Sequence, residues 1–255
     1  LVSYPMDEIF KVARKALSEG VKEIWLTSQD TFCYGFDIGT DLPSLLEKLV
    51  KLPGDFRIRV GMGNPDHIAR IGEKLIEMYK NPKVFKFLHL PLQAGDDETL
   101  KQMCRRYTVE EFVEIIEKFR QEIPGINIMT DVIVGFPTET EEQYWGTLNA
   151  VRKTSPDSIN ISRFWPRSGT PAAQMQQLSG EVVKHRSKVL TDIFHNISRM
   201  QNEQWIGWQG KVVIDEKGKD GQWIGRNDSY KQVIVEGDFK LGEVVEVKIV
   251  KAGIF

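Results

Sequence analysis

The chain has 255 residues, with 34 Lys and Arg against 36 Asp and Glu, which gives a formal net charge of −2. Its composition, 41% hydrophobic and 27% charged, is typical of globular proteins and excludes a disordered tail or a collagen-like repeat. No apolar run approaches the ~18 residues of a membrane-spanning helix, so no membrane partner is expected. The near-neutral charge argues against a generally basic nucleic-acid coat, although it is compatible with a local basic patch. The length suits one large domain, or a domain of about 200 residues and a small one.

The sequence contains two cysteines, Cys33 and Cys104, far apart and without the spacing of a metal or disulfide motif. Reduced thiols in a cytosolic protein are the ordinary interpretation, since disulfides occur in oxidising compartments. The first residues, LVSYPMDEIF, have neither the basic nor the apolar segment of a signal peptide. A cytoplasmic location is therefore expected. Because the first residue is Leu1 rather than Met, we also expect a trimmed chain or a fragment.

From Pro5 to about Trp165 the sequence alternates between helical and strand patterns. A proline followed by acidic residues begins the first helix, which ends at a glycine suited to a left-handed position. Strands joined by helices of about ten or more residues predict right-handed crossovers and a parallel sheet, whose active site lies at the strands' carboxyl ends. The pattern opens on a helix without a preceding strand, so the sheet looks truncated. Five strands are predicted, at residues 21–27, 56–62, 84–90, 126–136 and 157–165.

A long amphipathic helix over residues 179–207 precedes a different, C-terminal pattern. Short strand segments interrupted by Gly, Asp and Asn indicate a small antiparallel barrel. The predicted fold is therefore α/β. A partial barrel with the long linker helix is expected in residues 1–205, and the antiparallel barrel is expected in residues 206–255.

Polar residues and glycines gather at the ends of the five predicted strands. Because parallel strands end at one edge, these groups would converge on a pocket suited to a small molecule with carboxylate, amine and ribose hydroxyl groups. Taken singly, His89 could be a core histidine, and Gly95 and Gly135 could be turn glycines. The set as a whole indicates a site. Its members are Ser28, Gln29, Asp30, Arg59, Gly61, Asn64, Pro65, His89, Gln93, Gly95, Asp131, Gly135, Thr138, Glu139, Arg163, Arg167 and Gly169.

The motifs of several other enzyme classes are absent. VGMGNP supplies only the first two glycines of GxGxxG, and the sequence has no Walker A lysine, HExxH, GxSxG or metal-ligand cysteine pair. Hydrolase, kinase and zinc-enzyme hypotheses therefore have no support. The residues alone predict a cofactor-using α/β-barrel enzyme with a small β-barrel appendage.

Six segments resemble the radical S-adenosylmethionine methylthiotransferases, in the same order and over essentially the whole chain. They are LVSYPMDEI, VKEIWLTSQDTFCYGFDIGT, RIRVGMGNPDHI, FLHLPLQAGDDETLKQMCRRYTVEEF, TDVIVGFPTETEEQ and FWPRSGTPAAQM. TSQDTFCYG and VGMGNP look most like the archaeal and eukaryotic tRNA branch, which methylthiolates C2 of N6-threonylcarbamoyladenosine next to the anticodon. The C-terminal part is similar to a TRAM domain, a small RNA-binding β-barrel. The resemblance implies a partial (β/α)6 TIM-like radical-SAM barrel that lacks its first strand and its cluster loop.

The resemblance also implies cofactors and partners. A [4Fe–4S] cluster on a CxxxCxxC loop would cleave S-adenosylmethionine, and a second [4Fe–4S] cluster in a further N-terminal domain would deliver sulfur. The implied partners are tRNA, through its anticodon stem-loop, and a reductant protein. Neither Cys33 nor Cys104 can replace the loop, since three thiolates are needed close together. The chain alone is therefore expected to be inactive, as the C-terminal portion of a larger enzyme, and no metal ligand is predicted within it.

The family's S-adenosylmethionine pocket carries over onto the strand ends. Three positions depart from the usual motifs: Leu92 replaces a valine, Ala94 replaces a serine, and Thr138 replaces a glycine and restricts the turn. The residues implied in binding this cofactor are Thr27, Ser28, Gln29, Arg59, Asn64, His89, Gln93, Gly95, Asp131, Gly135 and Glu139.

In the C-terminal barrel, the pattern GRNxxYK implies RNA contact by Arg226, Asn227, Tyr230 and Lys231. Arginine would pair with phosphate, and tyrosine would stack on an unpaired base. The alternative is a purely structural barrel. Two other functions also stay open: a cluster-free module that binds RNA or a nucleoside, and the related branch that methylthiolates an aspartate of a ribosomal protein. VGMGNP and PRSGTPAA favour the tRNA branch.

Overall fold

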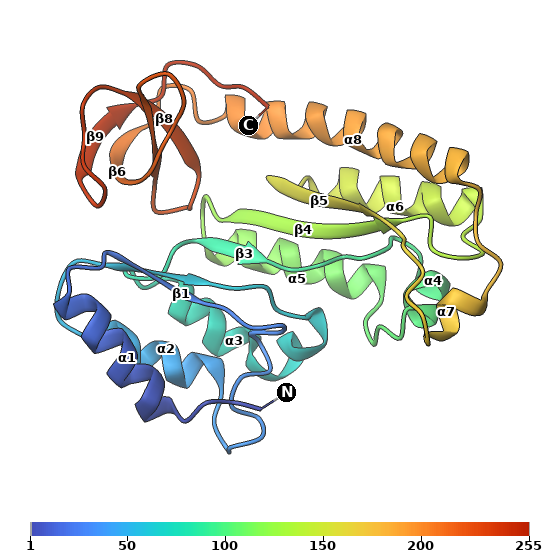
Figure 1. Ribbon diagram of the computed structural model, residues 1–255, viewed down its shortest axis with the longest axis horizontal. Coiled ribbons are helices and arrows are strands. Elements are labelled where there is room, and N and C mark those ends of the chain that lie inside the picture. Colours follow the sequence, from blue (N-terminus) through green and yellow to red (C-terminus); the bar gives the residue numbers. More distant parts are fainter. Residues whose placement is uncertain (1, 255) are drawn as a thin grey trace. The chain divides into compact units, whose positions relative to one another are not determined.

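The computed structural model describes residues 2–254, which fall into two units (Figure 1). The first unit combines residues 2–89, 119–127 and 205–251. The second combines residues 90–118, 128–204 and 252–254. Each unit therefore contains segments that are distant in the sequence.

Alternating helices and parallel strands form the N-terminal part of the first unit. β1 and β2 pair in parallel, with Trp25 opposite Arg59. The segment before β3 continues this arrangement, because the backbone N–H of Phe85 donates to the carbonyl oxygen of Ile58 at 2.9 Å. The helices cover one face of these strands and bury their apolar residues against it (Figure 1). The elements are α1 (Met6–Ser18), β1 (Glu23–Leu26), α2 (Leu42–Val50), β2 (Arg57–Val60), the 3-10 helix η1 (Pro65–His67), α3 (Ile68–Tyr79) and β3 (Phe87–His89).

A four-stranded antiparallel sheet completes the first unit. Its strand order is β8-β7-β6-β9, and a bulge interrupts β6 between Ile214 and Glu216. Val212 and Ile214 of β6 are fully buried. The strands are β6 (Gln209–Lys217), β7 (Gln222–Arg226), β8 (Gln232–Glu236) and β9 (Val244–Lys248).

The second unit contains the remaining parallel pair and the long helix. β4 and β5 pair in parallel, with Asp131 opposite Asn160. The side chain of Thr140 caps α6 and forms a capping box with Gln143, which fixes where this helix begins. The elements are α4 (Asp97–Gln102), α5 (Val109–Glu122, which continues into the first unit), β4 (Asn127–Val134), α6 (Glu141–Thr154), β5 (Ser158–Arg163), α7 (Pro171–Gln174) and α8 (Gly180–Glu203).

The predicted α/β fold, with parallel strands followed by an antiparallel sheet, is confirmed, and every predicted strand is present within a few residues. α6 begins only at Glu141, because Gly135 and Thr138 before it have φ angles of +77° and +66°, which no helix contains. The division into residues 1–205 and 206–255 stays a prediction, since the C-terminal sheet belongs to the same unit as β1–β3. Within residues 2–254, no helix has the length and apolar character required to cross a membrane.

Candidate cofactor site

The loops that follow β1 and β2 are tied together by Asp30. Its Oδ1 accepts hydrogen bonds from the backbone N–H groups of Phe32 and Asn64, both at 3.2 Å, and its Oδ2 lies 3.1 Å from Nε2 of His67. Thr27, Ser28 and Gln29 lie just before it and are exposed. Hydroxyl and amide groups are thus presented on a fixed loop at the carboxyl end of β1.

The end of β3 joins the same edge. The backbone N–H of Gly63 donates to the carbonyl oxygen of His89 at 3.1 Å. A Cβ atom at Gly63 would lie 2.0 Å from the buried ring of Phe32, so this close passage requires glycine. The structure therefore brings the predicted residues Thr27, Ser28, Gln29, Asn64 and His89 to one edge of the first unit.

Arg59 does not join them. Its guanidinium carbon lies 5.1, 4.8 and 5.1 Å from the ring centroids of Trp25, Phe87 and Tyr230. Its Nε is buried and has no hydrogen-bond partner among the described residues. Arg59 alternates with Ile58 and Val60 along β2, so its side chain points away from the helices and into this group of rings.

Gln93 and Asp131 meet in the second unit. The backbone N–H of Gln93 donates to the carbonyl oxygen of Asp131 at 2.8 Å, and the carbonyl of Gln93 accepts from Ile133 at 2.9 Å. The Asp131 carboxylate accepts from Nδ2 of Asn160 at 2.7 Å. Both predicted residues are partly exposed.

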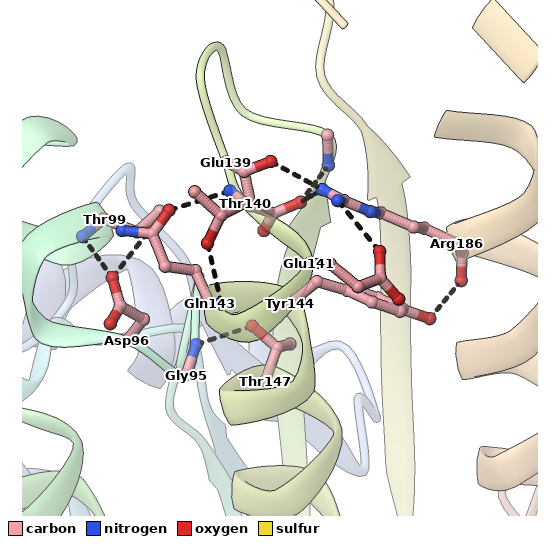
Figure 2. A network of polar contacts seen from close by, with 11 residues as sticks. Gly95, Asp96, Thr99, Glu139, Thr140, Glu141, Gln143, Tyr144, Thr147 and Arg186 are labelled. Atoms are coloured by element: carbon pink, nitrogen blue, oxygen red, sulfur yellow. Dashed lines mark hydrogen bonds and ion pairs between the residues drawn. The ribbon is translucent and has the colours of Figure 1, made fainter. Parts of the chain in front are cut away.

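Gly95 packs against α6, a role that its position after a predicted strand does not indicate. Its N–H donates to Oγ1 of Thr147 at 2.9 Å (Figure 2), and an added Cβ would lie 2.4 Å from the Cα of Thr147 and 2.6 Å from the carbonyl oxygen of Gly146. The loop after β3 therefore lies directly against the backbone of α6. Of the two interpretations kept open for Gly95, this close approach favours the structural one.

We expect Gly95→Ala to lower the free energy of unfolding by about 1–3 kcal/mol, because the added methyl group overpacks a backbone contact that cannot shift cheaply. Urea denaturation of the purified chain measures the change. Gly180→Ala is the matched control: apart from its chain neighbours and the backbone of its own helix, no heavy atom of residues 2–254 lies within 4 Å of its added Cβ. That control should stabilise the chain by about 0.4–1 kcal/mol. Equal stability of Gly95→Ala and wild type would contradict the described packing of this loop on α6.

Glu139 and Gly135 are joined inside the fold. The Glu139 side chain is 1% exposed, and its Oε2 accepts from the Gly135 N–H at 3.1 Å and from Nη1 of Arg186 at 2.7 Å (Figure 2). Burial raises the pKa of Glu139, and the hydrogen bond from Arg186 opposes the rise. Because the carboxylate is occupied by groups of this chain, direct contact between Glu139 and a cofactor stays a prediction.

Arg186 is a functional candidate that the sequence reasoning missed. It lies in the run Lys184, His185, Arg186 and Lys188, which is typical of a solvated helix face. The structure buries it on the same stripe of α8 as Leu190, Phe194 and Ser198. The four-residue spacing of this stripe is the signal that could have identified it.

The four residues predicted to contact RNA are enclosed by the first unit. Nε of Arg226 donates to Oδ2 of Asp215 at 2.9 Å, and Oδ1 of Asn227 accepts from the backbone N–H groups of Ser229 and Lys231 at 3.0 and 2.9 Å. Asn227, Tyr230 and Lys231 are buried, and Arg226 is largely covered.

Tyr230 inserts between two other aromatic rings. Its ring centroid lies 4.9 Å from that of Phe85 and 5.2 Å from that of Phe87. The neighbouring turn is fixed by backbone bonds, since Lys86 N–H donates to the Asp228 carbonyl at 2.8 Å. This enclosure favours a structural role for the turn at residues 226–231, and its RNA contact stays a prediction.

A pocket of 590 Å³ borders this turn within the first unit. Burial raises the pKa of Glu23 in the pocket wall, while its hydrogen bond from Nε1 of Trp25 opposes the rise. The pocket lies beside the amino-terminal end of β1, whereas Thr27, Ser28 and Gln29 follow the carboxyl end. It is therefore distinct from the strand-end site. Its lining includes Glu23, Trp25, Asp215, Arg226, Tyr230 and Leu241.

Asp30, Cys33 and His67 place one potential metal-ligating atom each within 4.8 Å of the others. Both carboxylate oxygens of Asp30 are already used within the loops. Burial and the neighbouring Asp30 raise the pKa of the Cys33 thiol, which disfavours the thiolate that a metal requires. We therefore assign these side chains to loop structure.

The fold and the strand-end motifs define a class of protein. Residues 1–151 match the family model of the radical SAM superfamily, and residues 210–253 match the TRAM domain. The chain belongs to the radical SAM superfamily. Membership implies S-adenosylmethionine and a [4Fe–4S] cluster as cofactors.

Curated relatives indicate which proteins of this superfamily the chain resembles. The chain is 45% identical to a probable threonylcarbamoyladenosine tRNA methylthiotransferase of Archaeoglobus fulgidus, over 98% of this chain and 58% of the relative. It is 46% identical to the protein of the same description from Pyrococcus horikoshii, over 99% of this chain and 59% of the relative. The human threonylcarbamoyladenosine tRNA methylthiotransferase is 40% identical, over 99% and 44%. These relatives confirm the predicted resemblance to the methylthiotransferases, and the chain spans 44–59% of their length.

Two solved structures share the fold. Coproporphyrinogen III oxidase from Escherichia coli, described as a radical SAM enzyme, has a TM-score of 0.55 and 14% identity, and the match covers 86% of this chain and 57% of that one. A radical S-adenosylmethionine methyltransferase from Kitasatospora setae has a TM-score of 0.52 and 16% identity, with coverage of 66% and 33%. At these identities the two neighbours show the fold alone.

The two cofactors fit this chain differently. A [4Fe–4S] cluster takes several thiolate ligands on closely spaced cysteines, and the sequence has only Cys33 and Cys104. The residues present therefore do not fit a cluster. Hydroxyl, amide and carboxylate groups at the strand ends do suit the polar groups of S-adenosylmethionine.

Proposed function

We propose that this chain is part of a tRNA-modifying enzyme that methylthiolates C2 of N6-threonylcarbamoyladenosine next to the anticodon. The observation that supports it is the identity of 45% and 46% to the two archaeal methylthiotransferases over 98–99% of the chain. Because the chain spans 58–59% of those relatives, the activity is proposed for a protein of their length.

In this proposal the strand ends bind S-adenosylmethionine. Thr27, Ser28 and Gln29 follow β1 as exposed donors and acceptors, and they would orient the methionine amine and carboxylate. Gln93 and Asp131 supply an amide and a carboxylate, and the carboxylate would accept from ribose hydroxyls. When bound, the cofactor supplies the hydrogen-abstracting group and the methyl group. The role of this chain is to hold and orient it.

Two [4Fe–4S] clusters, a reductant protein and a cytoplasmic location belong to the same proposal. The two cysteines of this chain do not provide the ligands of either cluster. The residues of this chain therefore have no role in the cluster chemistry of this proposal. tRNA would be the macromolecular partner, and the domain at residues 210–253 would contribute to its binding. Cluster-containing chemistry and RNA recognition would then lie in different parts of one protein.

Binding of anticodon stem-loops to the 255-residue chain tests the substrate. Fluorescence polarisation should show tighter binding to a stem-loop that carries the threonylcarbamoyl group than to the same stem-loop without it. Equal affinities would contradict the substrate assignment. Binding of the free nucleoside as tight as that of the stem-loop would instead support the cluster-free nucleoside module. Binding of the aspartate-containing ribosomal-protein segment would support the other branch of the family.

A further inference from the structure

One arginine of α8 is buried against the loop that joins β4 to α6. The Arg186 side chain is 5% exposed, although an arginine is rarely buried unless it is paired. It lies 47 residues after Glu139, its partner in the loop. The linker helix thus reaches back to the segment that follows the predicted cofactor residue Asp131.

The guanidinium of Arg186 binds this loop at several points (Figure 2). Nη1 donates to Oε2 of Glu139 at 2.7 Å and to the Glu139 carbonyl oxygen at 3.0 Å, and Nη2 donates to Glu141 at 3.1 Å. The Tyr144 hydroxyl donates to the backbone carbonyl of Arg186 at 2.7 Å. One side chain therefore binds the backbone and the carboxylate of Glu139 in the loop and the carboxylate of Glu141 at the start of α6.

The loop has a conformation that the local sequence alone would not favour. Thr138 has a φ of +66°, in the left-handed region that side chains with a Cβ rarely adopt. Gly135 has a φ of +77°, and an added Cβ there would lie 2.6 Å from Val183 of α8. Such a conformation persists only when surrounding contacts hold it. Arg186 of α8 supplies three of those contacts, and bonds within the loop and to Gln102 supply others.

The Glu139 carboxylate links the arginine to the strand end. The same oxygen, Oε2, accepts from Arg186 and from the Gly135 N–H, so the carboxylate fixes the peptide group that directly follows β4. Without the guanidinium, the buried Glu139 carboxylate would have no cation beside it, so it would take up a proton or the loop would open toward water. Lysine could supply the charge but could not make the forked set of bonds.

We propose that Arg186 is a positioning residue for S-adenosylmethionine: through Glu139 it holds residues 135–141 in the conformation that presents Gly135 and the end of β4 to the cofactor. This inference rests on the proposed function, since that function supplies the ligand. Arg186 itself does not touch the ligand.

The test compares Arg186→Met and Arg186→Lys with Lys188→Met in the full 255-residue chain. Lys188 is the matched control, because it forms an exposed ion pair with Asp192 on the same helix. Hydrogen exchange over residues 132–140 reports the loop, and ligand-observed NMR with S-adenosylmethionine reports binding. Both Arg186 variants should show faster exchange in this segment and about tenfold weaker binding, by analogy with residues that orient metal ligands. Lys188→Met should show neither change.

Unchanged exchange at residues 132–140 in both Arg186 variants would overturn the inference. Faster exchange spread evenly over the second unit, with unchanged affinity of the folded fraction, would also overturn it, because the arginine would then act on stability alone. Failure of the wild-type chain to bind S-adenosylmethionine is a different result: it would contradict the cofactor assignment in the proposed function, whatever the exchange of the loop.

Discussion

Tyr230→Ala is expected to lower the free energy of unfolding by about 3–5 kcal/mol, the usual cost of removing a buried aromatic side chain. The ring is enclosed by Phe85 and Phe87, and the guanidinium carbons of Arg226 and Arg59 lie 4.8 and 5.1 Å from its centroid. Burial raises the pKa of Tyr230 to about 12, so the hydroxyl stays neutral at physiological pH. Removal of the Tyr230 ring would leave a cavity between the antiparallel sheet and the parallel strands of the first unit.

Urea denaturation with intrinsic fluorescence measures this change, and Ile234→Ala on the next strand is the control. Ile234 is 55% exposed, so its truncation should change stability by no more than about 0.5 kcal/mol. If Tyr230→Ala instead retained wild-type stability and weakened stem-loop binding, the ring would serve RNA stacking, as the sequence pattern implied. A loss of stability with unchanged RNA affinity of the folded chain would support the structural role.

Glu139→Ala is expected to cost about 3–5 kcal/mol, because it leaves the buried Arg186 guanidinium without its main partner. The Arg186 guanidinium also has an exposed carboxylate partner, so a buried and an exposed ion pair can be compared at one arginine. Glu141, its second carboxylate partner, is 66% exposed. Glu141→Ala should therefore cost at most about 1 kcal/mol, as for other exposed ion pairs.

Equilibrium unfolding of the two variants in the same buffer decides this comparison. In the double variant Glu139→Ala, Arg186→Met, the losses should be less than additive, since the unpaired charge is removed along with its partner. Equal losses from Glu139→Ala and Glu141→Ala would show that burial does not set the strength of these two ion pairs.

Local sequence patterns predicted most of the fold. The apolar segments predicted β1 to β5 within a few residues. The ends of β1 and β2 could be expected to meet, because parallel strands finish at one edge. The gathering of Thr27, Gln29 and Asn64 follows from that rule.

Contacts between distant segments could not be predicted in this way. Arg186 belongs to a charged run, and although its four-residue spacing from Leu190 indicates the buried face of α8, its partner 47 residues earlier does not follow from that spacing. The turn at residues 226–231 looked like a surface for RNA, yet Oγ of Ser229 donates to the Gly125 carbonyl, 104 residues away. The local spacing of apolar and polar residues does not predict a hydrogen bond between segments so far apart in the sequence.

The interleaved make-up of the first unit has a consequence for synthesis of the protein. Residues 2–89 leave the ribosome well before residues 205–251, which complete the same unit. At ~5–20 residues per second, the intervening segment takes about 6–23 s to be translated. Throughout that interval Phe85 and Phe87 lack the Tyr230 ring that later packs between them. The nascent chain therefore carries exposed aromatic surface that chaperones recognise. A premature stop before residue 226 would leave that surface permanently uncovered, so the N-terminal half depends on the last part of the message.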